Sequence, residues 1–190
     1  MSDEQKEEGE AEFKNEDEIK ESTTISINDE VIPFSYRHRF PGQGIYKMKY
    51  TFNSLLTKTD YIFFYCGCLK KIDLTHFNTE KVTNMAYMFF NCFNAEIIDV
   101  SKLKTKNVTD MQCMFLCWEK LKKLEISKFD TRNVKNIHAI FNLTSDLTEL
   151  DLSNFNTKNV TYISSMFCGF VKLKKLDISN FNTENVTIMQ

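Results

Sequence analysis

The chain has 190 residues and a formal net charge of −2, so its length suits one domain and its overall charge favours no class of partner. The charge is unevenly distributed: residues 2–30 hold 12 acidic residues against 3 lysines, and the rest of the chain is basic. No apolar run approaches the roughly 18 residues that a membrane-spanning helix needs, and the N-terminus has no signal-peptide pattern. The sequence therefore excludes membrane insertion and predicts a cytoplasmic protein whose six cysteines stay reduced.

The N-terminal quarter differs in composition from the rest of the chain. Residues 1–24 are rich in glutamate and poor in apolar residues, and such a segment predicts a disordered acidic tail. Within residues 25–52, apolar and polar residues alternate in two stretches, 31–40 and 46–52, on either side of a Pro-Gly-Gln-Gly turn. This pattern predicts a β-hairpin that caps the N-terminal end of the following array.

A pattern of apolar residues recurs every 26 residues from Leu69 onward without a slip. Its copies are Leu69–Leu74, Ala95–Val100, Leu121–Ile126, Leu147–Leu152 and Leu173–Ile178. A fixed period of this length indicates a solenoid, in which each unit buries its apolar face against the next one. The predicted solenoid covers residues 53–190 and contains one degenerate unit, four full units and an incomplete last unit.

Each unit has the pattern of one short strand followed by one short helix. In residues 69–94, Ile72 and Leu74 point to the same side of the predicted strand. The apolar residues that follow recur three or four positions apart, which is helical spacing: Val82, Met85, Met88, Phe89 and Cys92. The predicted fold class is therefore an α/β repeat, a leucine-rich-repeat solenoid with one short parallel strand and one short helix per coil. Phenylalanines at equivalent positions are expected to form a core column: Phe63, Phe89, Phe115, Phe141 and Phe167.

Outward positions of the predicted strands also recur, and they define a candidate partner-binding face. In all five units an acidic residue lies between a flanking position, which is lysine in three of them, and a hydroxyl residue. Like charges on neighbouring strands, about 4.8 Å apart, repel one another, so the acidic column needs lysines, hydroxyls, a cation or a basic partner beside it. The candidate residues are Lys71, Asp73, Thr75, Asp99, Ser101, Lys123, Glu125, Ser127, Asp151, Ser153, Lys175, Asp177 and Ser179.

Two interpretations of this face stay open. In the first, neighbouring lysines and hydroxyls neutralise the carboxylates, and the face is an ordinary solvated surface. In the second, the face binds a protein partner, as the curved strand surface of solenoids typically does. A calcium site is not expected, because one carboxylate per coil does not provide the converging oxygen ligands that Ca²⁺ needs.

No catalytic or metal-binding arrangement recurs in the chain. Cys113 and Cys117 lack a matching ligand pair for zinc, and the three histidines, His38, His76 and His138, fall at unrelated positions. There is no Ser-His-Asp or Cys-His arrangement and no glycine-rich phosphate loop. The lysines are spread along the chain and are not clustered with stacking aromatics. We therefore expect no enzyme activity, no metal, no cofactor and no nucleic-acid partner.

Residues 173–189 and their copies resemble the BspA-like leucine-rich repeats, through the motif Leu-Lys-Lys-Leu-Asp-Ile-Ser-Asn-Phe-Asn-Thr-Glu-Asn-Val-Thr-x-Met. Residues 147–172 match the fuller unit best, and the resemblance covers about 69–190. It implies a right-handed solenoid with a sheet on one face, with protein binding as its usual activity and no catalytic residues. The expected function is a non-catalytic protein–protein interaction scaffold that binds an unidentified protein through the exposed strand face.

The same resemblance offers an alternative, because many members of that family are surface adhesins of bacteria and protists. The chain would then reach the cell surface by a route without a signal peptide and bind host or matrix proteins. Asn107, Asn142, Asn159 and Asn185 begin glycosylation sequons, most of which the cytoplasmic interpretation assigns to turns. Because the pattern stops in the middle of a unit, we also expect either a truncated gene product or an end covered by self-association.

Overall fold

The computed structural model describes residues 16–35 and 38–189, and the chain divides into two compact units, Met1–Ser54 and Leu55–Gln190. The first unit contains one helix and a small antiparallel sheet. The second unit is mostly irregular backbone with one two-stranded parallel sheet. Within the described residues, no helix has the length and apolar character of a membrane span.

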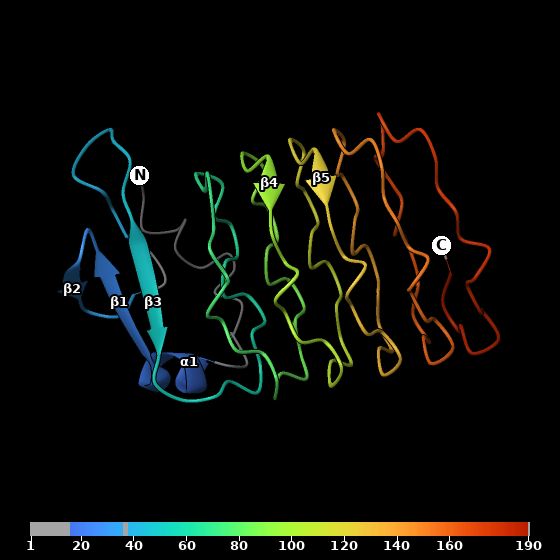
Figure 1. The fold of residues 1–190 in the computed structure, drawn as a ribbon, viewed down its shortest axis with the longest axis horizontal. Coiled ribbons are helices and arrows are strands. Elements are labelled where there is room, and N and C mark those ends of the chain that lie inside the picture. Colours follow the sequence, from blue (N-terminus) through green and yellow to red (C-terminus); the bar gives the residue numbers. More distant parts are fainter. Residues whose placement is uncertain (1–15, 36–37, 190) are drawn as a thin grey trace, which may run out of the picture. The chain divides into compact units, whose positions relative to one another are not determined.

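The first unit is built from α1 (Glu16–Ser22), β1 (Thr23–Ile27), β2 (Glu30–Ile32) and β3 (Met48–Phe52) (Figure 1). Its strands form one antiparallel sheet in the order β2-β1-β3. Ile25 of the central strand pairs with Ile32 on one side and with Tyr50 on the other, and it is 1% exposed. The sheet therefore has its buried centre on β1.

The predicted β-hairpin between 31–40 and 46–52 is wrong. Asn28 and Asp29 have φ values of 49° and 70°, and this left-handed pair connects β1 to β2 through a tight turn that favours such residues. The strand β3 then pairs with β1, so that Met48 faces Ile27. Pro33 follows β2 directly and has no N–H to donate, which explains why the strand ends there.

Residues 16–24 belong to the segment that was expected to be a disordered acidic tail, and here the structure differs. They form α1 and the first residues of β1. Ile19 is 3% exposed, and Ser22 and Thr23 are also buried. The prediction rests on the acidic composition of residues 1–24 as a whole. That composition does not reveal that a few residues at the end of this segment, including Ile19, are buried and so become ordered. The rest of the expected tail, 1–15, lies outside the described residues.

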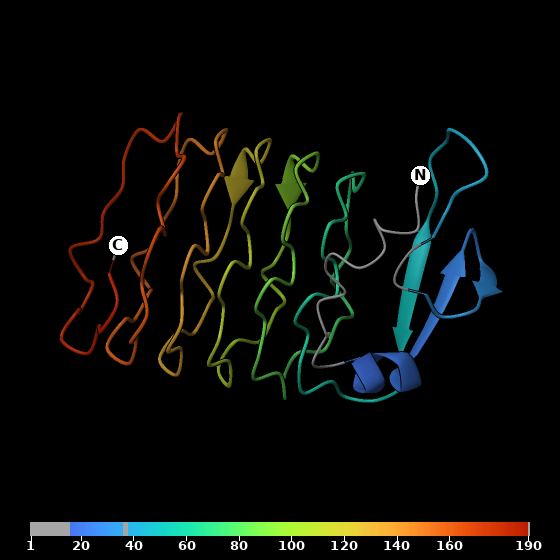
Figure 2. The same cartoon turned by 180° about the vertical axis from the view of Figure 1, so that it is seen from behind.

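The second unit consists of successive segments that lie side by side in chain order (Figure 1 and Figure 2). Further backbone hydrogen bonds join the same segments, such as those from Tyr87 N–H to Gln112 O (2.8 Å) and from Phe89 N–H to Met114 O (3.1 Å). Hydrogen bonds between equivalent positions, and not regular helices, hold neighbouring segments together. Parallel bridges connect Lys58 to Asn84, Asn84 to Asp110, Asp110 to Asn136, Asn136 to Tyr162 and Tyr162 to Ile188.

The helix predicted in each unit is wrong, because residues 55–189 contain no helix. Tyr87 and Asn91 have φ values of 57° and 60°, and residues in this left-handed region do not continue a right-handed α-helix. The N–H groups donate to the next segment or close short turns, as Met88 N–H does to Met85 O (3.3 Å). Left-handed residues recur at equivalent positions of the other segments: Tyr61, Tyr65, Cys113, Cys117, Ala139, Leu143, Ser165 and Gly169.

The predicted fold class, an α/β leucine-rich-repeat solenoid, is therefore wrong. Of the parallel strands expected, the described residues contain β4 (Ile97–Ile98) and β5 (Lys123–Leu124), which pair with each other, and one isolated bridge from Glu149 to Lys175. Successive short turns also bring a side chain to the same side every three or four residues, so their apolar spacing resembles that of a helix. Met85 and Phe89 are completely buried although neither lies in a helix.

Stacked phenylalanine rings form part of the core of the second unit. The ring centroids of Phe63 and Phe89 lie 5.4 Å apart, those of Phe89 and Phe115 5.7 Å, and those of Phe115 and Phe141 6.2 Å. The ring column expected from the sequence is confirmed for these four residues. The indole of Trp118, which is buried, meets Phe89 and Phe115 edge-on.

Candidate protein-binding face

The candidate partner-binding residues lie on exposed backbone of the second unit. Lys71, Asp73 and Thr75 are exposed, and so are their counterparts in later segments, except that Ser101 is half-buried. Ile98 and Leu124, which alternate with them on β4 and β5, are buried. The candidate side chains thus point outward in all five segments, although only 97–98 and 123–124 form a strand pair.

Four of the acidic side chains close a tight turn with the backbone two residues later. The Oδ1 atom of Asp73 accepts a hydrogen bond from the N–H of Thr75 at 2.9 Å. A turn of this kind holds the carboxylate in one orientation and leaves it exposed. The same contact joins Asp99 to Ser101 (2.9 Å), Asp151 to Ser153 (2.9 Å) and Asp177 to Ser179 (3.0 Å).

These local hydrogen bonds lower the pKa of the four carboxyl groups. For Asp73 and Asp99 the hydroxyl two residues later is the larger cause of the lowered pKa, and the backbone N–H is the next. For Asp151 and Asp177 the backbone N–H lowers the pKa more than the hydroxyl does. The carboxylates are thus stabilised in their charged form by their own turns. These hydrogen bonds offset part of the repulsion among the carboxylates, and this effect is compatible with both interpretations of the face.

Glu125 differs from the four aspartates because it pairs with a lysine. Its Oε1 atom lies 3.0 Å from Nζ of Lys123, and both side chains are exposed. Lys122, which precedes β5, pairs with Glu96 of the previous segment. Exposed ion pairs contribute at most about 1 kcal/mol each to stability, so these pairs do not hold the fold together. Among the described residues no group of three His, Cys, Asp or Glu side chains is placed to hold a metal ion.

Two hollows open on the second unit beside the candidate residues. One, of 420 Å³, lies next to Ser153 and is lined largely by amides, including Asn156 and Asn182. The other, of 320 Å³, lies next to Thr75 and is lined in part by Lys102. Both are open to solvent, whereas sites for small molecules usually bury most of the ligand. The surface is therefore better suited to a large partner than to a small ligand.

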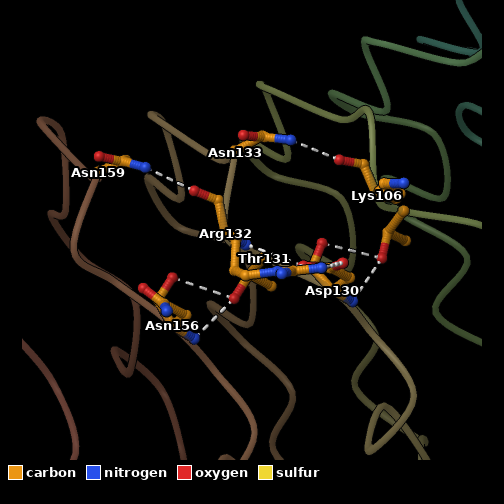
Figure 3. Close-up of polar contacts among 8 residues, drawn as sticks. Lys106, Asp130, Thr131, Arg132, Asn133, Asn156 and Asn159 are labelled. Carbon is orange, nitrogen blue, oxygen red and sulfur yellow. Dashed lines mark hydrogen bonds and ion pairs between the residues drawn. The ribbon is translucent and has the colours of Figure 1, made fainter.

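Buried threonines, which the sequence analysis missed, connect neighbouring segments (Figure 3). Thr131 is 2% exposed, and its Oγ1 donates to Asn156 O (3.1 Å) and accepts from Asn156 N–H (2.7 Å). The signal in the sequence was a threonine at one position of every segment, two residues after a buried apolar residue. The same reciprocal contact joins Thr79 to Lys104, Thr105 to Asp130 and Thr157 to Asn182.

Asparagines two residues after these threonines form a second set of contacts between segments. In Figure 3, Nδ2 of Asn133 donates to Lys106 O and Nδ2 of Asn159 donates to Arg132 O, both at 2.7 Å. Asn107 and Asn185 donate to the preceding segment in the same way. Three of the four sequon asparagines, Asn107, Asn159 and Asn185, therefore help to connect neighbouring segments.

Comparison with known proteins identifies a family but no activity. A family model described as "Mycoplasma protein of unknown function, DUF285" matches residues 11–97, 47–149 and 86–190. The three matches overlap and together cover almost the whole chain. No curated protein and no solved structure matches the chain. These comparisons therefore assign no activity to the chain, and its surface chemistry is the basis for a functional proposal.

Proposed function

The chain belongs to the DUF285 family, whose function is unknown, and we propose that it is a non-catalytic scaffold that binds a protein partner. The observation that supports this function is a row of exposed carboxylates whose orientation is already set by local hydrogen bonds. We name this surface the acidic face and define it by its carboxylates and the flanking lysines and hydroxyls: Lys71, Asp73, Thr75, Asp99, Ser101, Lys123, Glu125, Ser127, Asp151, Ser153, Lys175, Asp177 and Ser179.

Fixed side chains reduce the free-energy cost of binding. A rotamer-rich side chain that becomes ordered in an interface costs about 0.5–1.5 kcal/mol. Asp99 and Asp151 are already held by the N–H groups of Ser101 and Ser153, so part of this ordering occurs when the chain folds. A carboxylate has about four lone-pair sites, so each aspartate can accept further hydrogen bonds from a partner.

The charge pattern of the acidic face suits a partner with a basic or mixed surface. Carboxylates alternate with Lys71, Lys123 and Lys175, and complementary charge patterns provide specificity and faster association. No catalysis, metal, cofactor, nucleic acid or membrane insertion is part of the proposal. A cytoplasmic location is part of it, because all six cysteines are free thiols, which suits a reducing compartment.

A surface adhesin of the BspA-like type is the alternative proposal, and it is supported by the resemblance of residues 173–189 to that family. The two proposals differ in whether the sequons carry glycans. Glycosidase treatment of native protein followed by mass measurement distinguishes them. An unchanged mass supports the cytoplasmic scaffold, whereas a loss of mass at Asn107 or Asn159 supports the adhesin.

The scaffold proposal is tested by comparing the proteins that wild type and variants capture from native lysate. The triple variant Asp99→Lys, Glu125→Lys, Asp151→Lys reverses charge at the centre of the acidic face and is expected to lose the partner. Lysine also removes the acceptor of two turns, so a second variant is needed. Asp99→Asn, Glu125→Gln, Asp151→Asn retains those acceptors and removes only the charge, and it is expected to weaken binding while preserving the fold.

A matched control changes the same amount of charge away from the acidic face. Glu30→Lys, Glu119→Lys, Glu184→Lys alters three exposed residues that belong to neither the acidic face nor any hollow beside it. We expect this control to capture the partner as wild type does. If the face variants and the control all retain the same partners, the acidic face is a solvated surface and the proposal fails.

A further inference from the structure

A second charged surface of the second unit is basic, and we infer that it binds an acidic, extended segment of a protein partner. This inference goes beyond the proposed function, because it concerns side chains outside the acidic face. Residues 103, 105, 129, 131, 155 and 157 of this surface are buried, and the charged residues alternate with them. We name this surface the basic strip and define it by six exposed cations: Lys102, Lys104, Lys106, Lys128, Arg132 and Lys158.

The cations of the basic strip mostly lack close ion pairs, although Lys102 and Lys128 lower the pKa of Asp99 and Lys106 lowers that of Asp130. Arg132 is the exception, because its guanidinium donates two hydrogen bonds to Asp130, from Nε at 2.9 Å and from an Nη atom at 2.7 Å. The five lysines of the strip form no ion pair with any residue in the described part of the chain. A partner therefore does not have to displace existing ion pairs to reach them.

The backbone that carries the basic strip is held by hydrogen bonds between neighbouring segments. Lys104 N–H donates to Oγ1 of Thr79 at 2.7 Å. Lys106 O and Arg132 O accept from the side-chain amides of the next segments, as Figure 3 shows. The backbone positions that carry these cations are consequently held relative to one another, and several cations can meet the carboxylates of one bound segment.

One end of the basic strip borders a hollow. The hollow of 320 Å³ lies between residues 75–80 of one segment and residues 102–104 of the next, and its lining includes His76, Lys102 and Lys104. Glu80 is the single acidic residue of that lining. The two lysines would attract a bound acidic chain, and Glu80 would repel it. Removing the lysine charges should therefore weaken binding, and removing the Glu80 charge should strengthen it.

An acidic polypeptide fits the basic strip better than single-stranded nucleic acid does. Proteins that bind single strands stack the bases on exposed aromatic rings. The residues between the cations offer no such ring, because Phe129 and Phe155 are buried and Leu103 is aliphatic and buried. Residues 55–189 also contain no helix to enter the major groove of a duplex.

The test is a fluorescence anisotropy titration of the full chain into a labelled peptide of alternating Glu and Ser, at low salt. The triple variant Lys102→Gln, Lys104→Gln, Lys106→Gln is expected to weaken binding about tenfold, because it removes three exposed charge contacts. The control Lys70→Gln, Lys120→Gln, Lys174→Gln removes the same charge from exposed sites away from the strip and is expected to change the Kd by less than about twofold. Glu80→Gln is expected to tighten binding.

Three outcomes would overturn the inference. Equal weakening in the two triple variants would show that only net charge matters. Tighter binding of an oligothymidylate of the same length would assign the strip to nucleic acid. Absence of peptide binding to wild type at low salt would remove the site altogether. The strip variant is compared only if its circular dichroism matches that of wild type. If it does not fold, Glu80→Gln tests the inference instead, because it leaves every lysine in place. Unchanged or weaker peptide binding by Glu80→Gln contradicts the inference.

Discussion

Asp73, Asp99, Asp151 and Asp177 each accept the N–H group two residues later and also present a charge to solvent. Both properties depend on local spacing along the chain and not on a regular sheet. The candidate face could therefore be located from the sequence although the predicted strands are mostly absent. The sequence indicated that hydroxyls could offset these carboxylates, but it did not show that the backbone N–H two residues later closes a turn on each of them.

The lowered pKa values of these aspartates predict a defined dependence of stability on pH. A carboxyl group whose pKa is lower in the folded than in the unfolded chain stabilises the fold above its ordinary pKa of 3.8, and this contribution disappears as the pH falls through the folded value. We expect the free energy of unfolding, measured with urea, to fall below about pH 4.

The variant with all four aspartates replaced by asparagine separates this effect from the general acid response. Glu96 beside Lys122 and Asp130 beside Arg132 also have a lowered pKa, so the fall in stability should become shallower and not vanish. If the free energy of unfolding falls equally steeply with decreasing pH in the variant and in wild type, the account is contradicted.

Gly169 illustrates how left-handed positions shape the second unit. Its φ is 80°, and an added Cβ would lie 2.6 Å from Cδ2 and 3.1 Å from Cα of Leu143. We predict that Gly169→Ala lowers the free energy of unfolding by about 2 kcal/mol or more, because the left-handed backbone and the close approach both resist a side chain. Gly42→Ala is the matched control, because nothing lies within 4 Å of its added Cβ. Equal stability of the two variants would argue against a left-handed backbone at residue 169.

At the scale of elements, the spacing of Met85, Met88 and Phe89 predicted burial correctly and secondary structure wrongly. A helix and a series of turns give the same three-and-four spacing, so burial alone does not distinguish them. Residues with a left-handed backbone distinguish the series of turns from a helix. Most of them are not glycine, as at Tyr87 and Cys113, so their residue types do not indicate a left-handed conformation. Gly169 was the one glycine among them.

The pairing of β1 with β2 in the first unit has a recognisable sequence signal. Asn28 and Asp29 lie between two apolar stretches and are favoured in two-residue hairpin turns. That pair predicts the β1–β2 connection that the structure contains. The pairing of β3 with β1 spans a longer loop, and the order of strands in a sheet cannot be deduced from alternation alone.

Contacts between segments depend on the buried threonines, and Thr131→Val tests this directly. Valine has nearly the same shape but leaves both the N–H and the C=O of Asn156 without their partner. We expect the free energy of unfolding to fall by about 1–3 kcal/mol, since two part-buried hydrogen bonds are lost and each contributes about 0.5–1.5 kcal/mol. Thr183→Val is the control, because Thr183 is exposed, and it should change stability by less than about 0.5 kcal/mol. Similar losses in both variants would contradict the proposed role of the threonines.

At the scale of the whole chain, a net charge of −2 conceals surfaces of opposite sign. On the second unit, exposed carboxylates recur on the acidic face, and lysines without close ion pairs gather on the basic strip. Composition revealed that charge was unevenly distributed along the chain, but not that the lysines of neighbouring segments share a surface. That knowledge required the hydrogen bonds which align one segment with the next.

Carboxyl-group footprinting tests most directly whether the acidic face binds a protein. The protein is labelled with a carbodiimide and an amine, once in buffer and once in native lysate, and the modification of each carboxylate is measured by mass spectrometry. We predict that Asp99, Glu125 and Asp151 become protected in lysate while Glu119 and Glu184, which are exposed and lie off the face, are labelled equally in both. Unchanged labelling of the acidic face, or protection confined to Glu119 and Glu184, would contradict the account.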